Sequence, residues 1–141
     1  MNEKASEPAN VEPNPIVNRR LLDLRPSQIY LNSDKIEAVK RTVGNGAIAQ
    51  LLPIYVKYLG GDLMITDGHH RAYVAWLNGE VEIPTIIDTD DDMDWHAYEV
   101  CKDEWCKEAG ILTIADLAGR IIPTSEYEIL WIARCQAAFP D

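Results

Sequence analysis

The residues best suited to chemistry form one run, Asp67-Gly68-His69-His70-Arg71, which follows a strand-like apolar segment. The Asp-Gly pair favours a turn, and the residues after it predict a helix over 69–78 that Gly79 closes. Free backbone N–H groups at a helix start, together with the guanidinium of Arg71, attract a phosphate or another anion. The carboxylate of Asp67 could hold a metal ion there or accept a proton from a hydroxyl group. Both are tasks in phosphoryl transfer.

The same run also has a purely structural interpretation, which its spacing leaves open. Asp67 and Gly68 would then form only a turn, with Asp67 as the helix cap. The two histidines would lie in a solvated first turn of the helix. The residues themselves therefore predict a helix start, and a ligand site at that start is one of two interpretations.

Turn residues and apolar spacing predict the elements around this run. Gly60-Gly61 separates two β-rich segments and indicates a tight hairpin, while Pro84 indicates the start or edge of a strand. Ser33 is expected to cap one helix, and Ser125 with Glu128 has the spacing of a capping box. The predicted strands are 20–24, 53–59, 62–66 and 82–87, and the predicted helices are 34–43, 69–78, 95–109, 114–118 and 126–138.

The order of these elements predicts an α+β protein, because the strands lie before residue 88 and the helices mostly after it. Residues 1–18 are rich in proline and polar side chains, so we expect a disordered tail. Residues 19–88 would form a compact module with a mixed sheet. Residues 89–141 would form a helical C-terminal extension packed on that module.

Length and composition restrict the class of protein. A chain of 141 residues with 47% hydrophobic residues is expected to form one globular domain. No apolar run approaches the roughly 18 residues of a membrane span, and the first residues lack the apolar stretch of a signal peptide. Three cysteines fit reduced thiols, which favours a cytoplasmic location. A formal charge of −10 disfavours duplex DNA as a partner.

The segment 62–71, followed by Ala75, Leu77, Gly79 and Ile83-Pro84, resembles the signature of the ParB/sulfiredoxin superfamily. In that signature a hairpin strand runs into a Gly-x-x-Arg turn and a helix, and a Leu-x-Gly and an Ile-Pro strand follow. The resemblance extends from about residue 21 to residue 87. It implies a compact α/β nucleotide-binding module that holds a diphosphate or triphosphate at this helix start.

The branches of the superfamily differ at the motif. Sulfiredoxins have a catalytic cysteine where this chain has His69, which disfavours sulfinic acid reductase activity. Partition proteins share the Gly-x-x-Arg turn and bind CTP there, but they continue into a basic helix-turn-helix domain, whereas the residues after 88 here are few and acidic. Free-serine kinases are the most similar, since they too have Asp-Gly-His-His-Arg. Those kinases use a glutamate base where this chain has Gln28, so Asp67 or Glu37 would have to accept the proton.

By this resemblance, Gly68, His69, His70 and Arg71 would bind ATP, ADP or CTP. Asp67 and His70 would act in catalysis, and Asp67 would also bind Mg²⁺. Two functions stay open. One is a phosphotransferase or nucleotidase that acts with a small hydroxyl compound. The other is a non-catalytic nucleotide-sensing or protein-interaction adaptor.

Two further groups of residues could bind metals. From Asp88 to Glu99, carboxylates occupy positions one, three, five, seven and twelve of a calcium-loop spacing, but Met93 stands where the loop needs glycine. A solvated acidic loop, or a loose Mg²⁺ or Ca²⁺ contact, therefore fits better than an EF-hand. His96, Cys101 and Cys106 lack the spacing of a zinc site, so we expect buried free thiols.

Aromatic residues are numerous in the predicted extension. Trp95, Tyr98 and Trp105 keep roughly helical spacing, which is typical of a helix that packs on a core. The helix 126–138 is apolar on more than one face, so the C-terminal helices could also form a homodimer.

Overall fold

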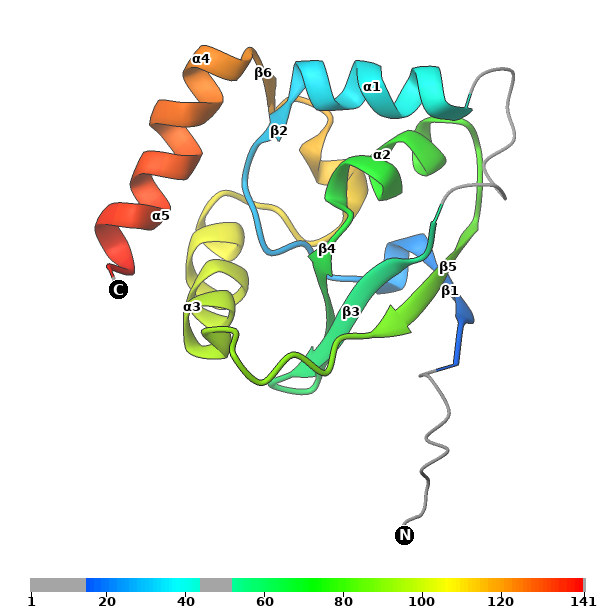
Figure 1. Ribbon diagram of the computed structural model, residues 1–141, viewed down its shortest axis with the longest axis horizontal. Coiled ribbons are helices and arrows are strands. Elements are labelled where there is room, and N and C mark those ends of the chain that lie inside the picture. The colour runs from blue at the N-terminus through cyan, green and yellow to red at the C-terminus, as the bar shows by residue number, and fades with distance from the viewer. Residues whose placement is uncertain (1–14, 44–51, 141) are drawn as a thin grey trace, which may run out of the picture.

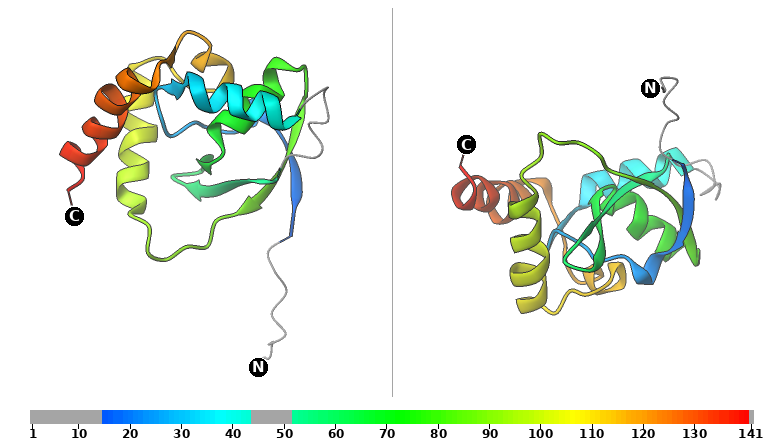
Figure 2. Two further views of the ribbon diagram at one scale, coloured as in Figure 1. Left: turned by 45° about the horizontal axis from the view of Figure 1, so that its top comes forward. Right: turned by 90° about the horizontal axis from the view of Figure 1, so that it is seen from below.

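The computed structural model describes residues 15–43 and 52–140 and has an α+β architecture (Figure 1). Its main sheet has the strand order β1-β5-β3-β4, with β3 parallel to β5 and the other neighbours antiparallel. The strands are β1 (Val17–Arg20), β3 (Ile54–Leu59), β4 (Asp62–Asp67) and β5 (Glu82–Ile87). The helices α1 (Ser33–Val43) and α2 (His69–Leu77) pack against each other on one side of this sheet (Figure 2). The predicted α+β class and mixed sheet are confirmed.

The hairpin of β3 and β4 forms as its sequence predicts. Gly60 and Gly61 have φ angles of 61° and 86°, which are left-handed values that glycine adopts without a steric cost. Ile54 and Val56 are buried while Tyr55 between them is exposed, so the side chains at the start of β3 alternate between the two faces of the sheet.

The predicted helical extension is confirmed, although its helices have irregular turns. One segment consists of α3 (Trp95–Val100) and the π-helical η3 (Cys101–Cys106), and the 3₁₀ helix η4 (Ile114–Leu117) follows. The last segment consists of α4 (Thr124–Tyr127), the π-helical η5 (Glu128–Ile132) and α5 (Ala133–Ala138). Tyr127 and Trp131 belong to the same buried core as the residues of the main sheet.

A second, two-stranded sheet joins the extension to the module, and no sequence pattern indicated it. The strand β2 (Leu31–Asn32) pairs in parallel with β6 (Ile121–Ile122). Each strand has only two residues, which is too short for an apolar alternation to be recognised.

The prediction of a strand over Arg20–Leu24 was wrong. The strand β1 ends at Arg20 and begins at Val17, inside the predicted tail, and the 3₁₀ helix η1 (Leu21–Asp23) follows it. Leu21 and Leu24 are both buried, and a single 3₁₀ turn brings residues three apart to one face. The rest of the predicted tail, up to residue 14, lies outside the described residues.

Two predicted helix caps were also wrong. The side chain of Asn32 accepts hydrogen bonds from the backbone N–H groups of Asp34 and Lys35, so Asn32 takes the place expected for Ser33. The last helical segment begins at Thr124, before the expected cap Ser125. The hydroxyl of Thr124 donates to Asn32 Oδ1 at 3.1 Å or to Asp34 Oδ2 at 2.6 Å, so a tertiary contact fixes this helix start. The sequence Gly44-Asn45-Gly46 predicts the end of α1, and these residues lie outside the described part of the chain.

Pro84 lies in an interior strand rather than at an edge, which corrects the prediction made from its missing N–H group. Its strand β5 stands between β1 and β3. Pairing with β3 starts only at Thr85, so Pro84 precedes the point where the second neighbour joins.

Among the helices that the structure describes, none is long and apolar enough to cross a membrane.

Candidate functional site

Gly68 connects β4 directly to α2, and its position requires a residue without a side chain. Its φ of 112° and ψ of 22° place it in the left-handed region. A Cβ atom at Gly68 would stand 2.4 Å from Cγ2 and 2.7 Å from Cβ of Ile54, which is closer than atoms can pack. The backbone at the start of α2 therefore approaches β3 too closely for any other residue.

The two histidines of the motif are bound to the backbone rather than solvated. The segment after η1 runs beside β4, because Arg25 pairs with Met64, and this brings Ser27 next to the start of α2. The backbone N–H of Ser27 donates to His69 Nε2 at 2.9 Å, and the backbone N–H of Asn32 donates to His70 Nε2 at 2.9 Å. The first turn of α2 is therefore braced against residues 27–32, which corrects the interpretation of a solvated histidine pair.

These contacts define the protonation state of both rings. Burial lowers the pKa of His69 to about 3, and the neighbouring His70 adds to the effect. Burial, with a smaller contribution from Lys35, lowers the pKa of His70 to about 4. Each Nε2 accepts a hydrogen bond, so both rings are neutral at pH 7 and carry their proton on Nδ1. The Nε2 lone pair of His70 is thus already in use.

Arg71 connects the segment before β3 with Asp67 at the end of β4. Its Nη1 donates to the backbone carbonyls of Leu52 at 3.2 Å and Pro53 at 3.1 Å, just before β3. Its Nη2 lies 3.6 Å from Asp67 Oδ2. The side chain is about one-fifth exposed, so one positive charge stays accessible beside the helix start.

Asp67 ends β4 and stands between the start of α2 and a cavity of about 670 Å³. Its side chain is 72% exposed, against 21% for that of Arg71. The cavity is lined by acidic residues, two tyrosines and the end of β5: Tyr55, Thr66, Asp67, Ile86, Ile87, Asp88, Thr89, Asp90, Met93 and Tyr98. Asp67 is thus the predicted site residue that the structure places in the cavity wall, whereas Gly68, His69, His70 and Arg71 lie on the helix side of it.

The cavity wall is held by hydrogen bonds among its polar groups. Thr66 Oγ1 donates to Asp88 Oδ2 at 2.8 Å, and burial together with the charges of Asp88 and Asp67 raises the pKa of Tyr98. Tyr98 therefore stays a protonated hydroxyl near neutral pH and can donate a hydrogen bond. The wall offers carboxylate acceptors and phenol groups, a combination that suits a cation or a hydroxyl compound.

The acidic run after β5 forms turns in the described structure. The backbone N–H of Asp90 donates to Asp88 Oδ1, and that of Asp92 donates to Asp90 Oδ1. These are local Asx turns. Within residues 15–43 and 52–140, no group of three or more His, Cys, Asp or Glu side chains is arranged to hold a metal ion.

Neither Gln28, which replaces the glutamate base of the kinases, nor Glu37, the alternative base to Asp67, lies beside Asp67. The amide Nε2 of Gln28 donates to the carbonyl of Tyr30 at 2.8 Å and to the hydroxyl of Tyr127 at 3.1 Å. Glu37 lies on the exposed side of α1, where it pairs with Lys40 at 3.5 Å. The structure therefore brings neither Gln28 nor Glu37 to the cavity beside Asp67.

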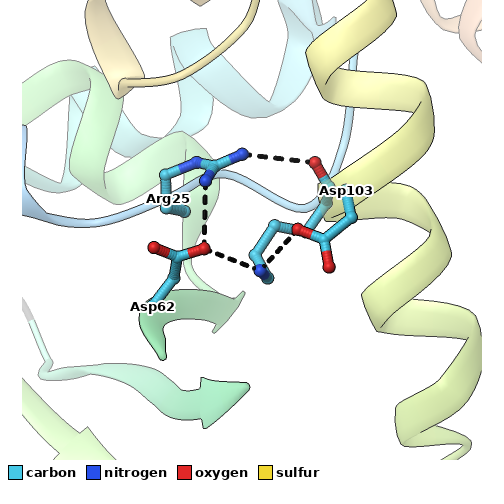
Figure 3. Close-up of polar contacts among 4 residues, drawn as sticks. Arg25, Asp62 and Asp103 are labelled. Atoms are coloured by element: carbon cyan, nitrogen blue, oxygen red, sulfur yellow. Dashed lines mark hydrogen bonds and ion pairs between the residues drawn. The ribbon is translucent and has the colours of Figure 1, made fainter. Parts of the chain in front are cut away.

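The sequence interpretation missed an ion network in which a buried lysine joins two partly exposed carboxylates (Figure 3). Lys102 is fully buried, and its Nζ lies 2.9 Å from Asp62 Oδ2 and 2.7 Å from Asp103 Oδ1. Arg25 Nη1 reaches the same Asp62 oxygen at 3.1 Å. The hydrogen bond from Lys102 lowers the pKa of Asp62 despite its burial. The network joins η3 to the β3–β4 hairpin. Asp62 and Lys102 are 40 residues apart, so no local pattern in the sequence predicts their contact.

Of the three aromatic residues with helical spacing, Trp105 packs against the core as predicted, whereas Trp95 and Tyr98 contact each other outside the core cluster. The ring of Trp105 lies 5.8 Å from that of Trp131 and 5.4 Å from that of Phe139. Trp131 is buried, and Trp105 is partly buried against the core. Ile129 and Leu130 remain exposed on this last helical segment.

No model of a known protein family matches the chain, and no curated protein matches it either. The chain is similar to a solved structure of the C-terminally truncated chromosome-partitioning protein ParB from Caulobacter crescentus, complexed with CTP-gamma-S. The identity is 15%, the TM-score is 0.45, and 91% of this chain and 94% of that chain are covered. It is also similar to protein Atu1540 from Agrobacterium tumefaciens, at 11% identity and a TM-score of 0.46, over 93% of this chain and 73% of that chain. The function of the chain therefore has to be inferred from its own residues.

Proposed function

We propose that the chain binds the phosphates of a nucleotide at the start of α2 and transfers a phosphoryl group to a small hydroxyl compound in the adjacent cavity. The observation that carries this proposal is the position of Asp67. Its carboxylate lines the cavity of about 670 Å³ and lies 3.6 Å from the guanidinium of Arg71. One exposed carboxylate thus stands between a cationic helix start and a space large enough for a small molecule.

The phosphate half of the site consists of the nine-residue helix α2 and its entry. The absent side chain at Gly68 lets the start of α2 pack closely on Ile54 of β3, and the positive end of the helix dipole lies beside Arg71. The motif itself resembles that of free-serine kinases, in which these residues serve the phosphates. In our proposal His69 and His70 hold the first turn in place, and their neutral rings add no charge.

The acceptor half of the site is the cavity wall. Asp67 would accept the proton of an attacking hydroxyl, or would hold Mg²⁺ on the phosphates. Asp88, Asp90 and Tyr98 would bind the rest of the acceptor by hydrogen bonds. Because three carboxylates line this space, it favours an acceptor that is neutral or positively charged over an anionic one.

A binding screen tests the nucleotide half. Calorimetric titration with ATP, ADP and CTP, each with and without Mg²⁺, should identify a nucleotide that binds. Arg71→Ala should weaken that binding by at least about tenfold, because a charge-assisted contact to phosphate is lost. Arg41→Ala is the matched control, since it removes an equal charge from an exposed position on α1. Equal affinities of the two variants would place the phosphates elsewhere.

The second candidate is a non-catalytic nucleotide-binding adaptor, and the environment of Gln28 favours it. Its amide replaces the glutamate expected in the kinases and is fixed by two hydrogen bonds. Product analysis by phosphorus NMR, with the bound nucleotide and a series of free amino acids and amino alcohols, separates the candidates. A phosphorylated hydroxyl product supports the transferase, and tight binding without any product supports the adaptor.

A further inference from the structure

A second cavity lies where the last helical segment runs alongside α3 and η3 (Figure 2). The ring of Trp105 contacts the rings of Trp131 and Phe139, and the guanidinium of Arg134 lies 4.1 Å from the ring of Trp105, so the two segments are held together. The cavity has a volume of about 310 Å³. Both segments contribute apolar side chains to its wall, namely Ala97, Trp131, Ile132 and Phe139.

The charge of this wall differs from that of the larger cavity beside it. Thr66 and Tyr98 line both cavities. Among the described residues, no charged side chain lines the smaller cavity, whereas Asp67, Asp88 and Asp90 line the larger one. An ion that entered the smaller cavity would lose its hydration without gaining a partner of opposite charge. The smaller cavity therefore favours an uncharged molecule.

Two polar atoms of the wall residues remain available to a ligand. The hydroxyls of Ser27 and Thr66 already donate hydrogen bonds within the protein, and the amide nitrogen of Gln28 donates two. Gln28 Oε1 and the hydroxyl of Tyr98 have no hydrogen-bond partner in the part of the chain that the structure describes. Both oxygens can accept a hydrogen bond, so they suit a ligand that carries an N–H or O–H donor.

The volume and the aromatic rings of the wall indicate the size and type of the ligand. An apolar cavity of about 150 Å³ is enough for benzene, so about 310 Å³ has room for two fused rings. Trp131 and Phe139 offer ring surfaces for edge or stacking contacts with an aromatic molecule. Cys101 and Cys135 add small, polarizable side chains that pack well against rings.

The irregular helical turns provide independent support for a ligand at this place. The π-helical turns η3 and η5 both line the cavity, through Cys101 on one side and through Trp131 and Ile132 on the other. Such turns are rare in proteins and occur frequently at functional sites. Their meeting at one cavity favours a binding role over a simple gap in packing.

We propose that the smaller cavity binds an uncharged aromatic molecule of about two fused rings that carries one N–H or O–H donor, as indole does. The rings lie against Trp131 and Phe139, and the donor bonds to Gln28 Oε1 or to the hydroxyl of Tyr98. This site is separate from the start of α2 and from Asp67, so it does not depend on phosphoryl transfer.

The test titrates indole into the full chain labelled with nitrogen-15 and follows the side-chain N–H signals of its four tryptophans by NMR. The signal of Trp131 should shift and saturate, with a Kd of about 1 mM or lower, as expected for so small a ligand. Trp76 lines a different cavity and serves as the reference signal. A Trp131 signal that does not shift, or a shift confined to Trp76, would overturn the proposal.

Matched variants test the position of the ligand. Ala97→Leu adds an isopropyl group to the cavity wall and should raise the Kd for indole by at least about tenfold, because it fills the space of the rings. Ala133→Leu makes the same change at an exposed position of α5 outside the wall, and should leave the Kd within about twofold. Equal values of Kd in the two variants would overturn the proposal.

Two analogues test the chemistry of the ligand on the wild-type chain, even where a variant fails to fold. 1-Methylindole lacks the N–H donor and should bind at least about threefold more weakly than indole. Indole-3-carboxylate carries a charge and should bind at least about tenfold more weakly. Analogues that shift the Trp131 signal with the same Kd as indole would contradict the uncharged, hydrogen-bond-donating ligand that we propose.

Discussion

The first turn of α2 and the acidic cavity meet at Asp67. They differ in whether their side chains already form hydrogen bonds within the protein. On the helix side, His69 and His70 accept backbone N–H groups, and Arg71 donates to two carbonyls. On the cavity side, Asp67 is largely exposed to solvent and faces a large space. The residues of this short motif therefore have two roles: the histidines stabilise the fold, and the carboxylate of Asp67 remains accessible to a ligand.

The largest effect that we expect comes from Gly68→Ala on the helix side. A Cβ would overlap Ile54 at 2.4 Å, and alanine is strained at a φ of 112°. The two costs together should lower the free energy of unfolding by about 2–5 kcal/mol, or prevent folding. Urea denaturation measures the change.

The matched control is Gly79→Ala at the other end of α2. Gly79 also has a positive φ, of 84°, but no atom lies within 4 Å of the place that a Cβ would take there. It should lose only the backbone term, about 1–2 kcal/mol. Equal losses in the two variants would show that the close contact with Ile54 does not restrict Gly68.

The next effect concerns acid stability. The pKa values of His69 and His70 fall from 6.5 to about 3 and about 4 on folding, so the unfolded chain binds protons at a higher pH than the folded one. The stability is complete above about pH 6.5 and is lost as the pH falls toward 4. Each histidine should contribute a slope approaching about 1.4 kcal/mol per pH unit. Urea denaturation between pH 7 and pH 5 measures the combined slope.

His96 on α3 provides the control for this titration, because its side chain is exposed. The variant His96→Gln should keep the wild-type slope. A free energy of unfolding that stays constant from pH 7 to pH 5 would contradict the buried, neutral state of the histidine pair.

The smallest effect on stability is expected in the cavity wall. Asp88→Asn keeps one oxygen that can accept from Thr66 and loses only the exposed acceptor of the Asp90 N–H group, so the free energy of unfolding should change by less than about 1 kcal/mol. The same change should weaken binding of a positively charged acceptor, which titration calorimetry can measure. A loss of stability as large as that of Gly68→Ala would show that the cavity wall is as essential to the fold as the helix side.

Local signals in the sequence predicted most of the fold. The hairpin followed from Gly60-Gly61, and the start and end of α2 followed from Gly68 and Gly79, because each of these glycines has a positive φ that residues with a side chain rarely adopt. The helical nature of residues after 95 followed from apolar spacing. These features depend on residues close in sequence, which a single sequence displays.

Features that depend on distant partners could not be predicted in this way. The pairing of β2 with β6 and the contact between Asn32 and Thr124 arise only when residues about 90 apart meet. The same holds for the buried Lys102, whose charge is balanced by Asp62. The motif was found from its residue types. The structural role of its histidines could not be predicted, because it depends on contacts with residues 27–32, which are about 40 positions away in the sequence.

The most direct test of the account is Asp67→Asn, with nucleotide binding and phosphoryl transfer measured in one preparation. Asparagine keeps the turn and removes the carboxylate, so binding should persist while transfer falls by about 10²–10⁴-fold. Asp91→Asn, an exposed neighbour of the cavity residues, should leave both unchanged. An active wild type whose Asp67→Asn variant is equally active would contradict the role that we assign to the carboxylate between helix and cavity.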